Sequence, residues 1–249
     1  MTIRVGLMGF GRIGRNLFRI LLDREDIEIA VISDIANHDG LEYLLRYDTI
    51  LGRFPYELSI KDGSLYTLGT QIKMLSARDP GDVNWKEYDV DVVIDATARP
   101  RSRTDLMKHV EQGAKKVVLC TMPEDEPDST IVMGINQSSL KPDDKLIYNS
   151  SITTHCAAPV VGILDKAFGI ERLCMTTIHA YTNAQSLADV PADDLRSSRA
   201  AGENIIPVET VAGPILEQLF PNLENKIDAL ALNVPVPNGS LVDMTVYTS

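Results

Sequence analysis

Three glycines near the amino terminus have the spacing that can hold a pyrophosphate. Gly9, Gly11 and Gly14 follow a short β-rich segment and open a stretch in which apolar residues recur at helical spacing. Glycine at these positions allows a tight turn after the strand, close approach of the backbone to phosphate, and close packing of the helix on the strand. The first N–H groups of the helix and its partial positive charge would complete the anion site. The pattern therefore predicts a dinucleotide-binding loop.

A dinucleotide-binding loop is usually followed by an acidic residue that binds the ribose, and the sequence has such a residue. Asp34 lies twenty residues beyond Gly14, at the end of the next predicted strand, where it can accept hydrogen bonds from both hydroxyls of an adenosine ribose. Because a carboxylate repels a 2′-phosphate, Asp34 favours NAD over NADP. A purely structural glycine turn is the alternative, and the strand, the helix and Asp34 together argue against it.

The elements that must position this loop follow from the periodicity of apolar residues. Strands alternate with helices over residues 1–150, which predicts an α/β domain of the Rossmann type with a doubly wound parallel sheet. The pair Asp62-Gly63 predicts a hairpin inserted at the sheet edge. The predicted strands cover residues 3–8, 28–33, 90–96, 115–120, 130–135 and 145–149, and the predicted helices cover 12–23, 39–46 and 103–112.

From residue 151 the pattern of elements changes. Residues 151–249 are predicted to form a second domain of α+β type, because helices and strands no longer alternate regularly. The predicted order is a helix at 155–168, a strand at 171–182, a polar loop to 204, a helix to 219, and strands at 228–234 and 241–247.

Charge and composition exclude several classes of protein. A formal charge of −11 without a run rich in Lys or Arg argues against nucleic acid or an anionic membrane as partner. No apolar run reaches the ~20 residues that span a bilayer. Cys120, Cys156 and Cys174 are odd in number and stand in apolar surroundings, which suits a reducing compartment better than a disulfide framework. We therefore predict a cytoplasmic protein without a metal site.

Several segments, the glycine loop among them, resemble one known family, the glyceraldehyde-3-phosphate dehydrogenases, in the family's own order. They are GLMGFGRIGR at 6–15, LRYDT at 45–49, GRFP at 52–55, TIHAYT at 177–182, ENIIP at 203–207 and VPVPN at 234–238. The resemblance implies NAD as cofactor and an α+β catalytic domain after the Rossmann domain. It implies that Arg12 and Ile13 give backbone N–H groups to the pyrophosphate, that Arg78 lies near the adenine, and that Thr97 and Cys120 flank the route to the nicotinamide.

The family's chemistry needs a thiolate that attacks an aldehyde and a histidine that activates it. By resemblance, the histidine is His179. Residues 151–156 read SITTHC where the family has SCTTNC, so Ile152 occupies the place of the nucleophile and cannot form an acyl intermediate. Cys156 matches the family's second cysteine, and we expect a packed small hydrophobic residue there rather than a surrogate nucleophile.

The phosphate-binding residues of the family are also altered. Asn233 stands where the family has an arginine, so the bidentate cationic grip on a sugar phosphate is lost. Thr182 and Thr210 keep phosphate-binding hydroxyls. The chain is also shorter at its carboxyl end than family members, so the catalytic domain is expected to be shortened and to need cover from another subunit.

Three hypotheses about function follow. The favoured one is a non-catalytic NAD-binding homologue with a regulatory or structural role. The second is an NAD-dependent aldehyde or sugar-phosphate oxidoreductase with altered chemistry that uses His179, or less readily Cys156. The third, a fully active phosphorylating dehydrogenase, contradicts Ile152. Because the polar loop at 184–202 packs across a subunit interface in the family, we also expect a homo-oligomer or a hetero-oligomer with similar subunits.

Overall fold

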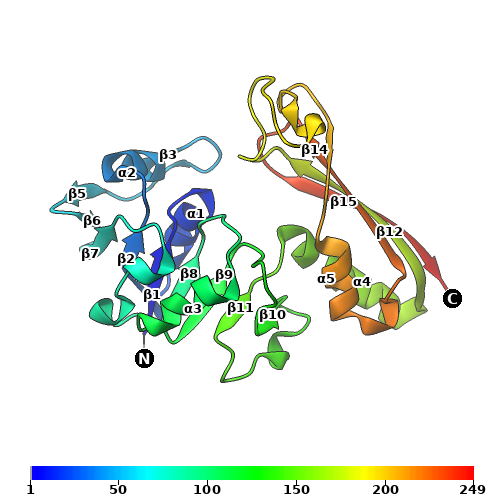
Figure 1. Cartoon of the computed structure of the whole chain (residues 1–249), viewed down its shortest axis with the longest axis horizontal. Helices are drawn as coiled ribbons and strands as arrows, with labels where there is room; N and C mark the ends of the chain where they lie inside the picture. Colours follow the sequence, from blue (N-terminus) through cyan, green and yellow to red (C-terminus); the bar gives the residue numbers. More distant parts are fainter. Residues whose placement is uncertain (1) are drawn as a thin grey trace. The chain divides into compact units, whose positions relative to one another are not determined.

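The computed structural model describes residues 2–249. The chain divides into two compact units, an amino-terminal unit of Met1–Ile131 with Ser138–Ser150 and a carboxyl-terminal unit of Val132–Gln137 with Ser151–Ser249 (Figure 1). Each unit has its own hydrophobic core.

The amino-terminal unit is built on a nine-stranded sheet with the order β10-β11-β9-β8-β1-β2-β7-β6-β5. Strands β10 to β7 in this order are parallel, whereas β7, β6 and β5 pair antiparallel. The doubly wound sheet predicted from the sequence is therefore confirmed. The strands are β1 (Ile3–Met8), β2 (Ile27–Ser33), β5 (Ser59–Lys61), β6 (Ser64–Thr67), β7 (Thr70–Leu75), β8 (Val92–Asp95), β9 (Lys116–Leu119), β10 (Ser129–Thr130) and β11 (Leu146–Tyr148), and the helices are α1 (Arg12–Leu21), α2 (His38–Arg46) and α3 (Arg103–Glu111).

The predicted hairpin at the sheet edge connects β5 to β6. Asp62 and Gly63 form its tip, and both have positive φ values, 52° and 66°. Two residues of positive φ match a type I′ turn, whose twist fits the right-handed twist of the flanking strands. A second antiparallel pair, β3 (Tyr47–Asp48) with β4 (Gly52–Arg53), follows α2.

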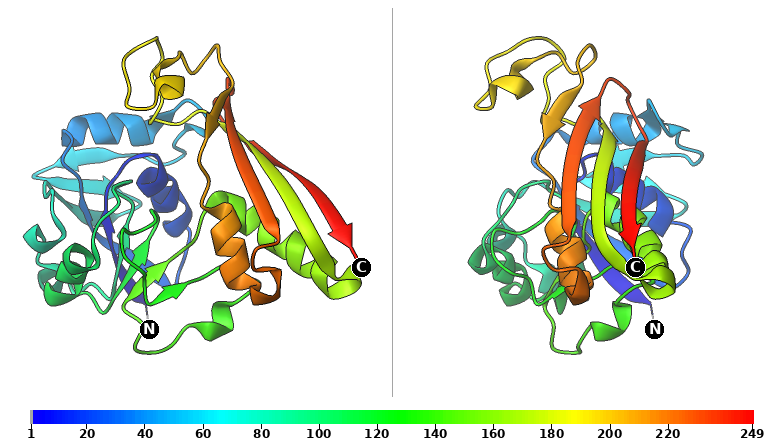
Figure 2. Two further views of the ribbon diagram at one scale, coloured as in Figure 1. Left: turned by 45° about the vertical axis from the view of Figure 1, so that its right-hand side comes forward. Right: turned by 90° about the vertical axis from the view of Figure 1, so that its right-hand side faces the viewer.

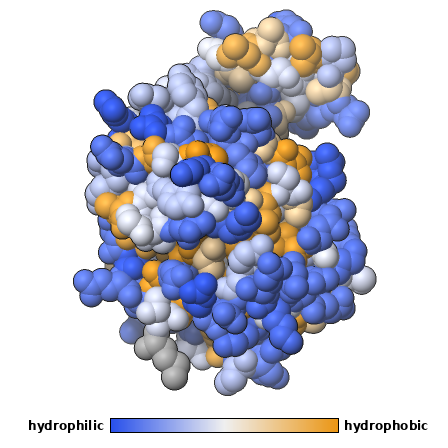
Figure 3. Space-filling view, turned by 90° about the vertical axis from the view of Figure 1, so that its left-hand side faces the viewer, coloured by the Kyte–Doolittle hydropathy of each residue, from blue (hydrophilic) through white to orange (hydrophobic). Residues whose placement is uncertain are grey.

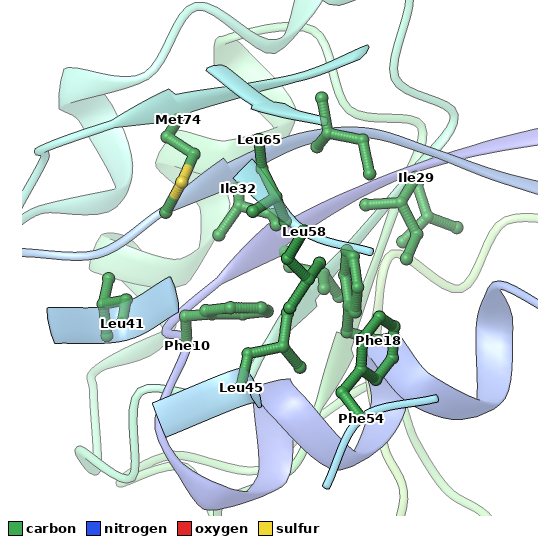
Figure 4. Packing of buried hydrophobic residues seen from close by; sticks show 13 residues of the cluster. Phe10, Phe18, Ile29, Ile32, Leu41, Leu45, Phe54, Leu58, Leu65 and Met74 are labelled. Atoms are coloured by element: carbon green, nitrogen blue, oxygen red, sulfur yellow. The ribbon is translucent and has the colours of Figure 1, made fainter. Parts of the chain in front are cut away.

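The hydrophobic core of the amino-terminal unit lies directly beneath the glycine loop. Phe10, the residue between two of the glycines, is fully buried, and its ring meets the Phe18 ring edge-on with centroids 5.4 Å apart (Figure 4). Phe18 in turn contacts the ring of Phe54, at 6.2 Å between centroids. The loop is thus anchored to the core by an aromatic side chain.

One predicted strand of this region is wrong. The sequence predicted a strand over 130–135, but only Ser129–Thr130 pairs with β11. Val132 then turns away, because its N–H donates to Asn136 Oδ1 at 2.8 Å and Gly134 adopts a φ of 90°. The apolar character of this segment instead reflects burial of Val132 in the core of the carboxyl-terminal unit.

The carboxyl-terminal unit is a four-stranded mixed sheet, ordered β13-β14-β12-β15, with α4 and α5 packed against one side of its long strands (Figure 2). Strands β12 and β14 are parallel, and the other two pairs are antiparallel. The α+β class predicted for this region is confirmed. Its elements are α4 (Ile152–Phe168), β12 (Ile170–Ala180), β13 (Ile206–Val208), α5 (Ala212–Leu219), β14 (Ile227–Val234) and β15 (Ser240–Thr248).

Two predicted helices of this unit have different bounds. Helix α4 begins at Ile152 rather than 155, because the Ser151 side chain accepts a hydrogen bond from Thr154 N at 3.0 Å and caps the helix. The helix predicted from 204 to 219 covers only Ala212–Leu219. The segment before it is the edge strand β13, in which Pro207 lacks the N–H that a helix interior needs.

The described residues contain no helix of sufficient length and apolar character to cross a membrane. Within the same residues, no group of three or more metal-ligating side chains comes together. Hydrophilic residues predominate on the face drawn in Figure 3, and hydrophobic ones appear there in separate groups.

Candidate functional site

The three glycines of the loop are required for different reasons. A Cβ on Gly14 would lie 2.1 Å from the carbonyl oxygen of Gly9, and a Cβ on Gly9, whose φ is 91°, would lie 2.7 Å from the backbone of Ala96. Both positions therefore exclude any side chain. Gly11 is different, because a Cβ there would meet nothing within 4 Å. The fold needs Gly9 and Gly14, whereas Gly11 leaves open space in front of the helix.

The start of α1 presents free donors to that space. Gly11 is the N-cap, no side chain caps the helix, and the first backbone bond that closes a turn runs from Arg15 N to Gly11 O at 3.0 Å. The N–H groups of the first turn, including those of Arg12 and Ile13, consequently have no acceptor within the helix. Their positions suit the pyrophosphate role that the resemblance implied.

Asp34 is held beside the loop by two backbone donors. Its Oδ2 accepts from Phe10 N at 2.6 Å, and its Oδ1 accepts from Ala36 N at 2.8 Å. Each carboxylate oxygen keeps a further lone pair for a ribose hydroxyl. This arrangement ties the end of β2 to the glycine loop, so the Asp34 carboxylate and the loop are fixed relative to each other. The preference for NAD over NADP stays a prediction.

A hollow lies beside the glycine loop and is here called the glycine-loop hollow; Gly11, Arg12, Ile13 and Gly14 are not among the residues that line it in the described chain. Four residues singled out from the sequence line it, namely Gly9, Asp34, Arg78 and Thr97, and its other lining residues are Met8, Ser33, Ile35, Ala77, Arg99 and Arg101. Gly9 and Gly14, which exclude side chains, and the free N-terminus of α1 fit the pyrophosphate of NAD. The Asp34 carboxylate fits its ribose. The arginines at 99 and 101 were missed, although their position just after a strand that ends beside Gly9 could have signalled them.

Cys120 is not among the residues that line the hollow in the described chain. It directly follows β9, and its N–H donates to Asp95 O at 3.0 Å. Burial, with a smaller contribution from the negative charge of Asp95, raises the pKa of the Cys120 thiol to about 11. The thiol is therefore neutral at physiological pH, and its role beside the cofactor stays a prediction.

A second hollow lies in the carboxyl-terminal unit, at the start of α4, and is here called the Ile152 hollow. Ile152, Cys156 and His179 all line it, so the structure brings these three predicted residues together; the others are Thr153, Ala180, Asn238, Gly239, Ser240 and Val242. The Ile152 side chain is 68% exposed at the first turn of the helix. A branched hydrocarbon thus occupies the position where helix N–H groups and a histidine could stabilise a thiolate.

The His179 ring has a defined orientation. Its Nδ1 lies 2.6 Å from the carbonyl oxygen of Ala180. Because a carbonyl can only accept, Nδ1 carries the proton of the neutral ring, and Nε2 remains as the basic nitrogen. A role of His179 as a proton acceptor in the hollow stays a prediction.

The expectation that Cys156 is packed is wrong. Cys156 is exposed, because it shares the outward face of α4 with Ile152 while Ala157 and Ala158 carry the buried face. Cys174 on β12 is exposed as well. The three cysteines are free.

The residues expected to bind phosphate form hydrogen bonds with other residues of the protein. Asn233 is 7% exposed, and its Nδ2 donates to Gln185 Oε1 at 2.7 Å. Gln185 Oε1 also accepts from Thr182 N at 3.1 Å. The Thr210 hydroxyl accepts from Ala212 N at 3.2 Å, at the start of α5. In the described residues, Asn233, Thr182 and Thr210 do not line the Ile152 hollow.

Comparison with known proteins agrees with this organisation. The family model "Glyceraldehyde 3-phosphate dehydrogenase, NAD binding domain" matches residues 3–103, and the model "Glyceraldehyde 3-phosphate dehydrogenase, C-terminal domain" matches residues 151–249. The chain is 48% identical to the glyceraldehyde-3-phosphate dehydrogenase of Streptomyces coelicolor over 248 residues, which are 99% of this chain and 74% of the relative. It is 45% identical to glyceraldehyde-3-phosphate dehydrogenase 2 of Bacillus subtilis, with coverage of 99% and 72%. The chain belongs to the glyceraldehyde-3-phosphate dehydrogenase family and has NAD as its cofactor.

Proposed function

We propose that this chain is an NAD-binding member of the family that does not oxidise an aldehyde through a covalent intermediate, and that it serves as a regulatory or structural subunit. The observation that carries the proposal is Ile152 in the hollow that also contains His179. Acyl transfer requires a nucleophile that forms a bond to the aldehyde carbon, and a hydrocarbon side chain has no such atom.

The phosphate side of the site supports the same proposal. Asn233 is neutral and short, and its amide is already hydrogen-bonded to Gln185. It cannot replace the charge-assisted, bidentate grip of an arginine on a sugar phosphate. Two separate requirements of the reaction, the nucleophile and the phosphate cation, are therefore unmet.

An activity assay tests the proposal. With NAD, inorganic phosphate and glyceraldehyde 3-phosphate, we expect no formation of NADH above the rate without protein, because no acyl-enzyme can form. Calorimetry on the same preparation is expected to show NAD binding, which demonstrates that the protein is folded. NADH formation that persists in the Cys156→Ala variant and disappears in His179→Asn would contradict the proposal.

A second candidate function is an NAD-dependent oxidoreductase with altered chemistry. It is favoured by one observation, the exposed Cys156 thiol in the same hollow as the His179 ring. A panel of aldehydes tests this alternative, with Cys174→Ala as the control because Cys174 is also exposed but lies outside the hollow. Turnover lost in Cys156→Ala and kept in Cys174→Ala would assign the thiol as a relocated nucleophile.

We further propose that the protein associates with a second copy or with a similar subunit. The sheet of the carboxyl-terminal unit exposes large apolar side chains, among them Leu230 (67%) and Leu241 (58%), and the loop at 184–202 exposes Leu187 (88%). Large exposed apolar side chains that gather on one part of a protein are typical of protein interfaces. A cytoplasmic location and the absence of nucleic-acid and membrane partners are part of the same proposal.

Light scattering tests the association. At micromolar concentration we expect a dimer or a larger assembly for the wild type. Leu230→Asp combined with Leu241→Asp is expected to shift the protein towards the monomer, because two charges would be buried without partners. Leu68→Asp, at a leucine that is 55% exposed in the other unit, is the control. A monomeric wild-type protein would refute this part of the proposal.

A further inference from the structure

We propose that Arg101 is a positioning residue that sets the affinity for NAD by holding together two walls of the glycine-loop hollow. The Arg101 side chain is only 9% exposed, and it lines the hollow. Its guanidinium donates to Arg78 O at 2.9 Å and lies 3.5 Å from Asp79 Oδ1 and 3.7 Å from Asp95 Oδ2. One buried cation thus reaches two separate chain segments.

The first wall is the loop that follows β7. Arg78 lines the hollow with its neighbour Ala77, whose N–H donates to Ser33 Oγ at 3.2 Å. Asp79 begins a short helical turn and forms a capping box with Asp82. The Arg101 guanidinium holds both the Arg78 carbonyl and the Asp79 carboxylate of this loop.

The second wall is the turn that follows β8. Asp95 Oδ1 accepts from both Thr97 N, at 3.0 Å, and Thr97 Oγ1, at 2.7 Å. The same turn supports the glycine loop, because a Cβ on Gly9 would lie 2.7 Å from Ala96 and 2.8 Å from the Cα of Thr97. Any displacement of Asp95 would therefore shift Thr97 and press on the loop that faces the pyrophosphate.

The other oxygen of Asp95 is buried and depends on Arg101 for a counter-charge. His109 Nε2 lies 3.5 Å from Asp95 Oδ2, and the fully buried ring accepts from Trp85 Nε1 through Nδ1 at 3.0 Å. Because Trp85 can only donate, the neutral ring of His109 carries its proton on Nε2. Burial acts to raise the pKa of Asp95, but the His109 ring 3.5 Å away and the hydrogen bonds from Thr97 outweigh it and lower that pKa. Asp95 therefore stays a carboxylate, and Arg101 is the fixed cation beside it.

Some buried polar atoms around Asp95 form no hydrogen bond. Among the described residues, Asp95 Oδ2 and Arg101 Nε are buried without a hydrogen-bond partner. The pair is held at ion-pair distance rather than by a direct hydrogen bond, so it depends on the surrounding walls for its geometry. Removal of Arg101 would leave a buried carboxylate uncompensated and both walls free to move. NAD would then have to order the walls on binding, which lowers affinity.

The test measures binding and stability, so its result does not depend on whether the protein is catalytic. Arg101→Met keeps an unbranched stem similar to that of arginine and removes the guanidinium. We expect it to weaken binding of NAD by about tenfold or more and to weaken binding of AMP as well, because Arg78 of the first wall is expected to lie near the adenine. The control is Arg103→Met, since Arg103 pairs with Asp128 outside the hollow. Wild-type affinity in Arg101→Met, even with a lowered melting temperature, would overturn the proposal.

Two further variants separate positioning from direct contact and from loss of folding. Arg101→Lys keeps the charge but not the planar fork, so we expect near-wild-type stability with severalfold weaker NAD binding. If Arg101→Met does not fold, NAD binding by Arg101→Lys tests the proposal, and wild-type affinity in Arg101→Lys would overturn it. Asp95→Asn keeps the acceptor for Thr97 and removes the charge that faces Arg101. If Arg101 acts through Asp95, the effects of Asp95→Asn and Arg101→Lys on the dissociation constant are non-additive, whereas additive effects overturn the proposal.

Discussion

Gly14→Ala is expected to destabilise the amino-terminal unit by about 3 kcal/mol or more, because its methyl group would overlap backbone rather than a movable side chain. The new Cβ would lie 2.1 Å from the carbonyl oxygen of Gly9. No rotamer relieves such a contact, so α1 must move away from the strand that precedes it. Thermal unfolding and chemical denaturation of the protein without ligand measure the loss.

Gly11→Ala is the matched control within the same loop. A Cβ there meets nothing within 4 Å in the described structure, so the fold accommodates it. Loss of glycine at this N-cap costs at most about 1 kcal/mol. The methyl group would nevertheless occupy open space at the start of α1, where a pyrophosphate is expected to approach the backbone, so we expect NAD affinity to fall by about tenfold or more while the protein stays folded. Unchanged NAD binding in Gly11→Ala, or unchanged stability in Gly14→Ala, would contradict this reading of the loop.

The sequence predicts most of the amino-terminal unit because its signals are local. The glycine spacing, the apolar strands and the Asp62-Gly63 turn each specify structure within about ten residues. The prediction of a strand at 130–135 was wrong because the apolar Val132 is buried in the core of the other unit rather than in the sheet. Periodicity alone cannot distinguish a sheet strand from a buried connecting segment.

The site was less predictable than the fold. Residues such as Gly9 and Asp34 could be found because a motif fixes both their types and their spacing. Cys156 was misjudged because its exposure depends on which face of α4 packs on the sheet, and Ala157 and Ala158, not the cysteine, fill that face. The role of Arg101 could not be predicted even from its position after a strand, since its partners Asp79 and Asp95 meet it only in the folded chain.

The geometry around residue 152 also predicts the result of an attempt to restore catalysis. Ile152→Cys would place a thiol in the first turn of α4, in the hollow that contains the basic nitrogen of His179. The N-terminus of α4 and the His179 ring both favour a thiolate, so we expect the new thiol to react with iodoacetamide at neutral pH faster than Cys174 does. Peptide mass spectrometry separates the two sites.

Reactivity of the thiol should not be enough for efficient turnover of a sugar phosphate. The Ile152→Cys variant still lacks the cation that Asn233 replaces, and one charge-assisted hydrogen bond to phosphate contributes about 1.5–3 kcal/mol. We therefore expect Ile152→Cys with Asn233→Arg to exceed Ile152→Cys alone by roughly one to two decades in kcat/KM for phosphorylating oxidation. Asn233→Arg alone is the control and should stay inactive, because it has no nucleophile.

The position of Asn233 sets a further condition on that gain. Asn233 is nearly buried and bonded to Gln185, which also holds the N–H of Thr182. A longer arginine must displace Gln185 before its guanidinium can reach a ligand. Gln185→Ala added to the double variant is therefore expected to raise kcat/KM further by lowering KM, with kcat little changed. A single Ile152→Cys variant as active as the double variant would show that phosphate is held by other groups, and that the loss of catalysis rests on residue 152 alone.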